Sequence, residues 1–312
     1  MNEKLNRFLE EGTYSYVALG SFDGLHSGHL SLVNKIIELA NENKGRSIVY
    51  TFKNHPRTLI KGATPPKLLM DNESKEEILE ALGVDLIYFE EFNEEYMKLT
   101  PEGFIKYLCE KFKVKGIVVG FNYRFGYKNI GNIEMLKELS TKYGYELYVM
   151  EPCNYENEVI SSTRIRDELL NGNVDKAMKM LNRPYIIKGK VVHGKKLGRT
   201  IGFPTANISI NKNMIIPKVG IYATKVYVNG KIYYGATNIG YNPTVNGDNL
   251  SIETNILNFD EDIYGKVITI EFLERIRDEK KFNGIEELKS QLQKDTNYVC
   301  KKYICKREKV MI

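Results

Sequence analysis

Short apolar runs alternate with helical patterns through the first half of the chain. Helical spacing is clear where Leu30, Val33, Ile37 and Ala40 follow one another at intervals of three and four residues. The apolar runs cover residues 16–19, 47–52, 84–89, 116–120 and 146–150, and further helical patterns cover 74–83, a stretch that begins at 101, and 133–143. Strands that are apolar throughout are typical of a parallel sheet buried on both faces. We therefore predict an α/β domain here.

Two of these helices carry a start signal. Ser74 and Glu77 have the spacing of a capping box, so a helix is expected to begin at Ser74 and to end near Gly83. Pro101 stands where proline is tolerated, in the first turn of a helix.

The pattern changes after residue 150. Two helices are predicted over residues 161–172 and 174–181, and strands rich in Ile, Val and Tyr over 185–192, 220–228, 231–239, 251–257 and 267–273. Asn229-Gly230 is a strong signal for a two-residue hairpin turn, and residues 283–286 open a closing helix. The pattern predicts an antiparallel barrel or sandwich. We place the domain boundary between residues 182 and 183, which gives domains 1–182 and 183–312.

The composition is that of a globular protein large enough for one large domain or two ordinary ones. The chain has 312 residues, of which 42% are hydrophobic and 27% charged. A net charge of +5 suits an enzyme that handles anionic ligands and does not by itself indicate a nucleic-acid partner.

Cysteine usage and hydropathy indicate the compartment. The four cysteines form no C-x-x-C pair, so reduced thiols are expected; they are Cys109, Cys153, Cys300 and Cys305. The charged N-terminus does not resemble a signal peptide, and no apolar run approaches the roughly 20 residues that span a membrane. We expect a cytoplasmic protein that binds neither membrane nor nucleic acid; weak self-association is left open.

The stretch GSFDGLHSGH, residues 20–29, places two of the four histidines in a glycine-rich loop between a strand and a helix. His26 and His29 are three residues apart and point the same way at a helix start. Glycines let a ligand approach the backbone, and a helix N-terminus attracts phosphate. The stretch has no lysine and is not a P-loop. A structural role or a zinc site are the alternatives, but no Cys or acidic residue has clear ligand spacing.

Other polar stretches suit anions or metals less specifically. HGKKLGRTIGFPTAN, residues 193–207, combines glycines with cations, and its PTAN segment offers oxygen ligands suited to Mg²⁺, although ordinary turn chemistry explains it equally well. ISSTR, residues 160–164, is either a phosphate-binding helix start or a plain cap.

Five stretches, in order, carry a resemblance to a known family. GSFDGLHSGH resembles the G-x-F-D-G-x-H-x-G-H signature of the HxGH nucleotidyltransferases. TFKNHP (51–56), VVGFNYRFG (118–126), ISSTRIRDELLNG (160–172) and RPYIIKGKVVHGKKLGRTIGFPTANI (183–208) resemble further segments of the bacterial bifunctional riboflavin kinase/FAD synthetase family. The resemblance implies a Rossmann-like adenylyltransferase domain followed by a β-barrel riboflavin kinase domain with a closing helix.

For the first domain the resemblance implies conversion of FMN and ATP to FAD and pyrophosphate. His26, His29 and Arg164 are then expected to act on the reacting phosphates, and His55 to line the flavin site. The expected ATP and phosphate contacts are Gly20, Phe22, Gly24, Gly28, Asn122, Arg124, Ser162 and Thr163.

For the second domain the resemblance implies conversion of riboflavin and ATP to FMN and ADP. Glu253 matches the family's catalytic glutamate, which takes a proton from the riboflavin hydroxyl; Arg277 is expected to close over the flavin. Thr205 and Asn207 are expected to hold Mg²⁺. The expected phosphate contacts are Gly194, Lys195, Gly198, Arg199 and Gly202.

Two departures from the family pattern fall in the first domain. Asn122 stands where the family has Asp, and Lys53-Asn54 replaces a more usual Asp-Pro. A kinase with a weakened or altered adenylyltransferase is therefore the first alternative. A flavin- or nucleotide-binding regulator is the second; an RNA-binding protein on the same fold would need a basic-aromatic module that the chain lacks.

Overall fold

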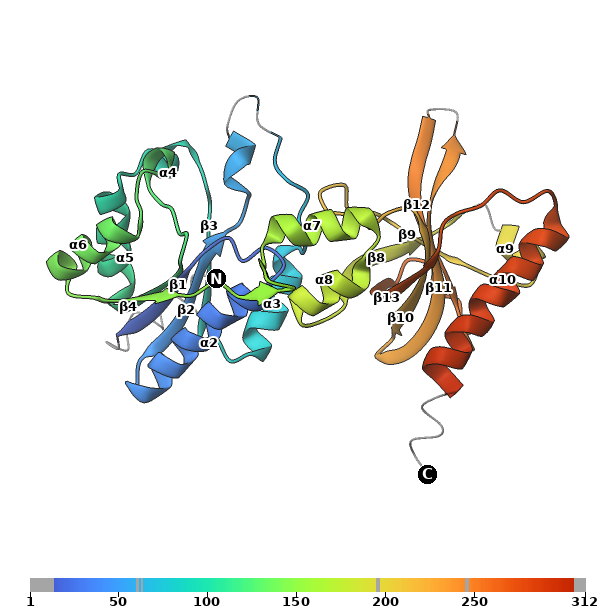
Figure 1. Ribbon diagram of the computed structural model, residues 1–312, viewed down its shortest axis with the longest axis horizontal. Coiled ribbons are helices and arrows are strands. Elements are labelled where there is room, and N and C mark those ends of the chain that lie inside the picture. Colours follow the sequence, from blue (N-terminus) through green and yellow to red (C-terminus); the bar gives the residue numbers. More distant parts are fainter. Residues whose placement is uncertain (1–13, 60–61, 63, 195–196, 245–246, 306–312) are drawn as a thin grey trace. The chain divides into compact units, whose positions relative to one another are not determined.

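The computed structural model describes residues 14–59, 62, 64–194, 197–244 and 247–305. The chain forms two compact units, Met1–Ser162 and Thr163–Ile312 (Figure 1). Each unit has its own sheet and its own core, as the change of pattern along the sequence predicts.

The first unit is built on a parallel sheet of order β3-β2-β1-β4-β5. Its strands are β1 (Ser15–Leu19), β2 (Arg46–Phe52), β3 (Leu86–Glu90), β4 (Val114–Gly120) and β5 (Glu146–Met150). The order reverses between β1 and β4, and such switch points are where ligands bind in open α/β sheets, beyond the carboxyl ends of the strands. The predicted parallel sheet is confirmed.

Helices cover both faces of this sheet (Figure 1). Side chains of α5 (Pro101–Phe112) and α6 (Ile133–Tyr143) pack on one face together with Val17 and Ile117, and those of α2 (Ser27–Glu42) and α3 (Asn72–Ala81) pack on the other. Because each central strand is buried on both sides, its residues are apolar without alternation. Short segments at the edges are η1 (Pro56–Leu59), α4 (Glu94–Met97), η2 (Tyr127–Asn129) and the hairpin of β6 (Asn154–Tyr155) with β7 (Glu158–Val159).

One predicted helix start is wrong. Helix α3 begins two residues before Ser74, and its cap is Asp71, whose carboxylate accepts a hydrogen bond of 2.7 Å from the Ser74 backbone N–H. An ionised carboxylate is a stronger acceptor than a serine hydroxyl at a helix N-terminus. The start at Pro101 is confirmed, with Thr100 as cap.

The second unit contains a closed antiparallel barrel of order β10-β11-β12-β9-β8-β13. Its strands are β8 (Tyr185–Val192), β9 (Ala206–Ile208), β10 (Gly220–Val228), β11 (Lys231–Thr244), β12 (Gly247–Ile256) and β13 (Val267–Arg277). The Asn229-Gly230 hairpin is confirmed: both residues have positive φ, 51° and 76°, as a type I′ turn requires. Strand β9 was not predicted.

Helices complete the second unit. α7 (Ser162–Asn171) begins at the division between the units, and α8 (Val174–Leu181) packs against β8 and β13. α10 (Ile285–Val299) packs on β11 and continues as the π-helical turn η3 (Cys300–Ile304) (Figure 1). The units divide directly after Ser162, the first residue of α7, whereas the sequence places the domain boundary after α8; that boundary stays a prediction. In the described ranges, no helix is both long and apolar enough to cross a membrane.

Candidate active sites

The glycine-histidine loop follows β1 at the carboxyl edge of the sheet. His26 is the N-cap of α2, and its Nδ1 accepts a long hydrogen bond of 3.4 Å from the His29 backbone N–H. The two imidazole rings stack, with centroids 3.7 Å apart and planes 18° from parallel. The structure thus brings both histidines together at a helix N-terminus, as their spacing predicts.

The glycines of this loop make room for the rings. A Cβ on Gly28 would lie 3.2 Å from His26 Cε1, and one on Gly20 would lie 3.2 Å from the Phe22 ring. Gly24 has a φ of 84°, in the left-handed region that favours glycine. Phe22 is fully buried, with its ring centroid 5.3 Å from that of His29, so it supports the histidines from beneath.

Side chains from distant segments hold the loop backbone. The Ser21 carbonyl accepts hydrogen bonds from Thr51 Oγ1 on β2, at 2.9 Å, and from Lys75 Nζ on α3, at 3.0 Å. The buried Asp23 accepts a bond of 2.9 Å from the Leu69 backbone N–H. The loop conformation is therefore set by tertiary contacts. Asp23 belongs to the predicted loop but was not named as a site residue, and Lys75 was missed because the charged run around it looks like an ordinary solvated helix face.

The ISSTR helix start reaches the same loop. Ser162 Oγ donates a hydrogen bond of 2.9 Å to the Asp23 carbonyl. Thr163 is exposed and Arg164 half-buried in the first turn of α7. Ser162 is thus brought to the loop.

The remaining predicted residues of the first unit follow neighbouring strands. Asn122 and Arg124 are exposed after β4, which pairs with β1 and ends at the same edge of the sheet. His55 is half-buried, and its Nδ1 accepts a bond of 3.1 Å from the Arg57 backbone N–H in the turn after β2.

An aromatic cluster near the end of β2 was not predicted as part of the site. Phe52, Phe92 and Tyr96 are half-buried and contact one another edge to face, with ring centroids 5.4–5.7 Å apart. The buried Tyr50 hydroxyl donates a hydrogen bond of 3.1 Å to the Tyr96 hydroxyl, and burial raises the pKa of Tyr96 above its ordinary value. Because Phe92 and Tyr96 lie far along the chain from Phe52, no local pattern could reveal the cluster.

In the barrel, strand register assembles the second set of residues. Glu253 on β12 lies opposite Asn207 on β9, and its Oε2 accepts a hydrogen bond of 3.4 Å from Thr205 Oγ1. Glu253 is half-buried, while its neighbours Ile252 and Thr254 are fully buried. The predicted base and the predicted metal ligands therefore lie together.

The glycines of the second loop are required by close packing. A Cβ on Gly194 would lie 2.3 Å from the amide nitrogen of Asn207, and one on Gly198 would lie 2.2 Å from the Phe203 carbonyl oxygen. Gly202 has a φ of 86°. Lys195 lies outside the described residues.

A cavity of about 420 Å³ opens beside these residues. Arg199, on the short helix α9 (Leu197–Thr200), and Thr205 line it. The other lining residues are Val191, Pro204, Ala206, Thr254, Ile256 and the segment 259–264. That segment was not predicted to contribute, since its acidic and aromatic residues match an ordinary turn.

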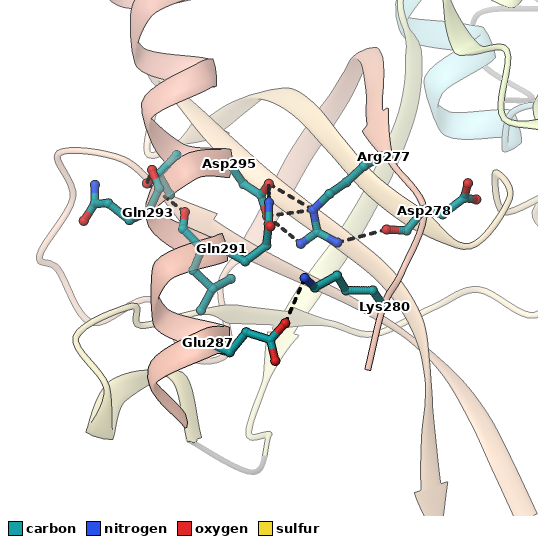
Figure 2. A network of polar contacts seen from close by, with 9 residues as sticks. Arg277, Asp278, Lys280, Glu287, Gln291, Gln293 and Asp295 are labelled. Carbon is teal, nitrogen blue, oxygen red and sulfur yellow. Dashed lines mark hydrogen bonds and ion pairs between the residues drawn. The ribbon is translucent and has the colours of Figure 1, made fainter. Parts of the chain in front are cut away.

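Arg277 makes a different contact from the one expected. Its guanidinium forms a forked ion pair with Asp295 on α10, with Nη2–Oδ2 at 2.6 Å and Nε–Oδ1 at 3.0 Å, and Nη1 donates to the Asp278 carbonyl (Figure 2). Asp295 is only 3% exposed and also accepts from Gln291. Arg277 therefore ties β13 to α10, and its contact with flavin stays a prediction.

Comparison with known proteins agrees with this two-site arrangement. The family model described as FAD synthetase matches residues 9–164, and the model described as riboflavin kinase matches residues 181–303. The bifunctional riboflavin kinase/FMN adenylyltransferase of Bacillus subtilis is 40% identical over 92% of both chains. The chain belongs to this bifunctional family. It is an enzyme with a FAD synthetase module and a riboflavin kinase module, as predicted.

Other relatives agree. The bifunctional riboflavin kinase/FMN adenylyltransferase of Escherichia coli K12 is 34% identical over 89% of this chain and 90% of its own. A crystal structure titled macrolide-efflux protein from Streptococcus pneumoniae has a TM-score of 0.86 at 33% identity and covers 92% of this chain and 94% of its own. The predicted fold, an α/β domain followed by a β-barrel, is confirmed, and the family favours two activities over a regulator.

Proposed function

We propose that the two sites act in sequence: the barrel converts riboflavin and ATP to FMN and ADP, and the histidine loop converts FMN and ATP to FAD and pyrophosphate. The observation that carries this proposal is the presence, in separate units, of stacked histidines at a helix N-terminus and of a carboxylate paired with the PTAN segment. A cytoplasmic location suits such an enzyme, because ATP and FMN are available there.

At the histidine loop, an FMN phosphate oxygen attacks the α-phosphorus of ATP while the bond to the β-phosphate breaks and pyrophosphate leaves. No group of the chain needs to be covalently modified, so catalysis rests on positioning and charge stabilisation. His26, His29 and the N–H groups at the start of α2 face the reacting phosphates in this proposal. Ser162, Thr163 and Arg164 hold the leaving phosphates at the start of α7.

The flavin ring of FMN is proposed to lie on the aromatic cluster of Phe52, Phe92 and Tyr96. Because the three half-buried rings meet edge to face, the face of any one of them can stack on a planar ligand while the others border its edge. His55, one turn beyond β2, is proposed to line the edge of the same surface, and Asn122 and Arg124 to contact the nucleotide.

In the barrel, Glu253 is proposed to take the proton of the riboflavin hydroxyl. The hydroxyl oxygen then attacks the γ-phosphorus of ATP, and ADP leaves. The Thr205 hydroxyl and the Asn207 amide oxygen, beside Glu253, offer oxygen ligands that fit Mg²⁺, which needs few protein ligands. When bound, Mg²⁺ would neutralise charge on the transferring phosphates. Arg199 in the cavity wall would contact the phosphates beside it.

Two variants test the separation of the sites. We expect His29→Ala to abolish FAD formation and to leave FMN formation nearly intact, and Glu253→Gln to lower FMN formation by about 10²–10⁴-fold while FAD formation from supplied FMN continues. Chromatography of the products over time measures both. If either variant, still folded, stops both reactions equally, the two-site assignment is wrong.

Asn122 motivates a second candidate, a kinase whose adenylyltransferase is weakened. An amide at this exposed position cannot carry the negative charge of the family's carboxylate. The wild-type chain given riboflavin and Mg-ATP distinguishes the candidates, because FMN that accumulates without FAD favours the second. In that case Asn122→Asp should restore FAD formation.

A further inference from the structure

A lysine is buried beneath the glycine-histidine loop. Lys75, in the first turns of α3, is 4% exposed, and among the lysines of the described ranges it alone is buried. Its Nζ donates to the Ser21 carbonyl at 3.0 Å and lies 5.9 Å from the centre of the Phe89 ring. In the sequence it belongs to the charged run ESKEE, which indicates only a solvated helix face.

Burial of this ammonium group is unfavourable unless interactions of its charge offset the lost hydration. Loss of hydration lowers the pKa of Lys75 to about 8, and the nearby Asp23 carboxylate offsets part of that effect. A methionine would fill the same volume without this cost, so packing alone does not explain a lysine here. The contacts of the ammonium group are with the loop, at the Ser21 carbonyl and near Asp23.

The loop itself needs external support. Phe22 and Leu25 have φ values of 49° and 41°, which are unfavourable for side chains of that size and persist only where the surroundings hold them. The Ser21 carbonyl, directly before Phe22, is held from two sides, by Lys75 and by Thr51. Both contacts therefore fix the turn that presents His26 at the start of α2.

We propose that Lys75 is a positioning residue of the adenylyltransferase site: it holds the loop backbone under the ATP phosphates, and its buried charge favours an anion above the loop. A buried charge acts through a lower effective dielectric than a surface charge, so its field on a triphosphate is less screened. This inference rests on the proposed role of the histidine loop in adenylyl transfer.

Lys75→Met is the principal test. The variant keeps the side-chain volume and removes the charge, and we expect FAD formation from FMN and Mg-ATP to fall by about 100-fold, the scale of a small misplacement of reacting groups. The KM for ATP should rise and the KM for FMN should change little, a split that a general loss of packing would not produce. Lys75→Arg should recover part of the ATP affinity. FMN formation by the barrel should be unchanged.

Lys111→Met is the matched control. Lys111, on α5, is half-buried and lies 4.3 Å from the centre of the Tyr88 ring, but its ammonium donates to Tyr88 and Tyr107 on the opposite face of the sheet. The Lys111→Met variant should leave FAD formation unchanged. A folded Lys75→Met variant with FAD formation within twofold of wild type would overturn the proposal.

A second variant keeps the test decisive if Lys75→Met does not fold. Thr51→Val removes the other hydrogen bond to the Ser21 carbonyl without a change in charge. It should lower kcat for FAD formation about tenfold with little effect on the KM for ATP. Wild-type kinetics in a folded Thr51→Val variant would overturn the claim that a fixed Ser21 carbonyl positions the loop. His29→Ala, measured alongside, separates the two claims. If His29→Ala retains FAD formation, the site assignment fails; if it loses FAD formation while Lys75→Met retains it, only the role of Lys75 fails.

Discussion

The two sites are assembled in different ways. In the first unit, side chains from β2, α3 and α7 hydrogen-bond the backbone of one loop, at Ser21 and Asp23. In the barrel, ladder register alone places Glu253 opposite Asn207, and the glycine loop packs against that pair. A loop held by individual side chains is sensitive to single substitutions far along the chain, whereas a site on paired strands is sensitive mainly to changes that disturb its immediate neighbours.

The two units also differ in the polar groups that they bury. The first unit buries charge under its loop, with Lys75 near Asp23. The barrel interior instead contains a row of neutral hydroxyls, Thr224, Thr237 and Thr254, with successive Oγ1 atoms 2.8 Å apart. Its buried carboxylate, Asp295, lies outside this row, on α10. Substitutions in these groups test the comparison.

The largest effect on stability is expected from Asp295→Ala. It leaves the Arg277 guanidinium partly buried without its carboxylate partner, and loss of one member of a buried pair costs about 3–5 kcal/mol. Urea unfolding followed by circular dichroism measures the loss. Asp278→Ala is the control, since that carboxylate pairs with Arg275 but is 78% exposed, and it should shift the transition little. Equal shifts would mean that α10 is not anchored by the buried pair.

Gly194→Ala should damage the kinase without unfolding the barrel. The added Cβ would meet the end of the Asn207 side chain, which can move aside, so the cost falls on the amide proposed to bind Mg²⁺. We expect FMN formation to fall by about 100-fold, with FAD formation from FMN unchanged. Gly284→Ala, where nothing lies within 4 Å of an added Cβ, is the control. Loss of both activities would argue against separate assembly of the sites.

Thr237→Val should destabilise the barrel by a smaller amount. Thr224 Oγ1 donates to the Gly235 carbonyl, so Thr237 must donate to Thr224, and Thr254 must donate to Thr237. Valine removes the central hydroxyl and leaves the Thr254 hydroxyl without its acceptor, at a cost of about 1–3 kcal/mol. Thermal unfolding measures the loss. Thr269→Val is the control, because Thr269 is half-buried and lies outside the row. Equal melting temperatures would show that the row contributes nothing.

The smallest effect concerns pH. The pKa of Lys75 is lowered to about 8 in the folded chain, below its ordinary value of 10.5, so between these values the unfolded chain binds more protons and stability rises with pH. Lys75→Met removes this contribution. From pH 8 to pH 9 the unfolding free energy of wild type should therefore rise by about 1 kcal/mol more than that of the variant. Identical pH dependence in urea titrations would contradict burial of the ammonium.

Much of the fold and part of the candidate site could be predicted. The strand at 146–150 and the helix at 133–143 match their predicted bounds, because long periodic patterns reflect burial directly. Strand β9 was missed, since three residues after a Gly-Phe-Pro-Thr stretch give no periodicity and pair only when β8 and β12 flank them. The cap of α3 was misplaced because Asp71 and Ser74, three residues apart, are both residue types that cap helices, and only the structure shows that the Asp71 carboxylate accepts the bond from the Ser74 N–H.

The sequence by itself determined the two-unit organisation, the hairpin at Asn229-Gly230 and the residues of the histidine loop and PTAN segment, since each depends on local spacing or on backbone freedom. The tertiary structure alone decided that Lys75 lies under the loop, that Arg277 pairs with Asp295, and that Thr205 meets Glu253. Those contacts join residues far apart in the chain, and whether a charged side chain is solvated or buried depends on what packs over it.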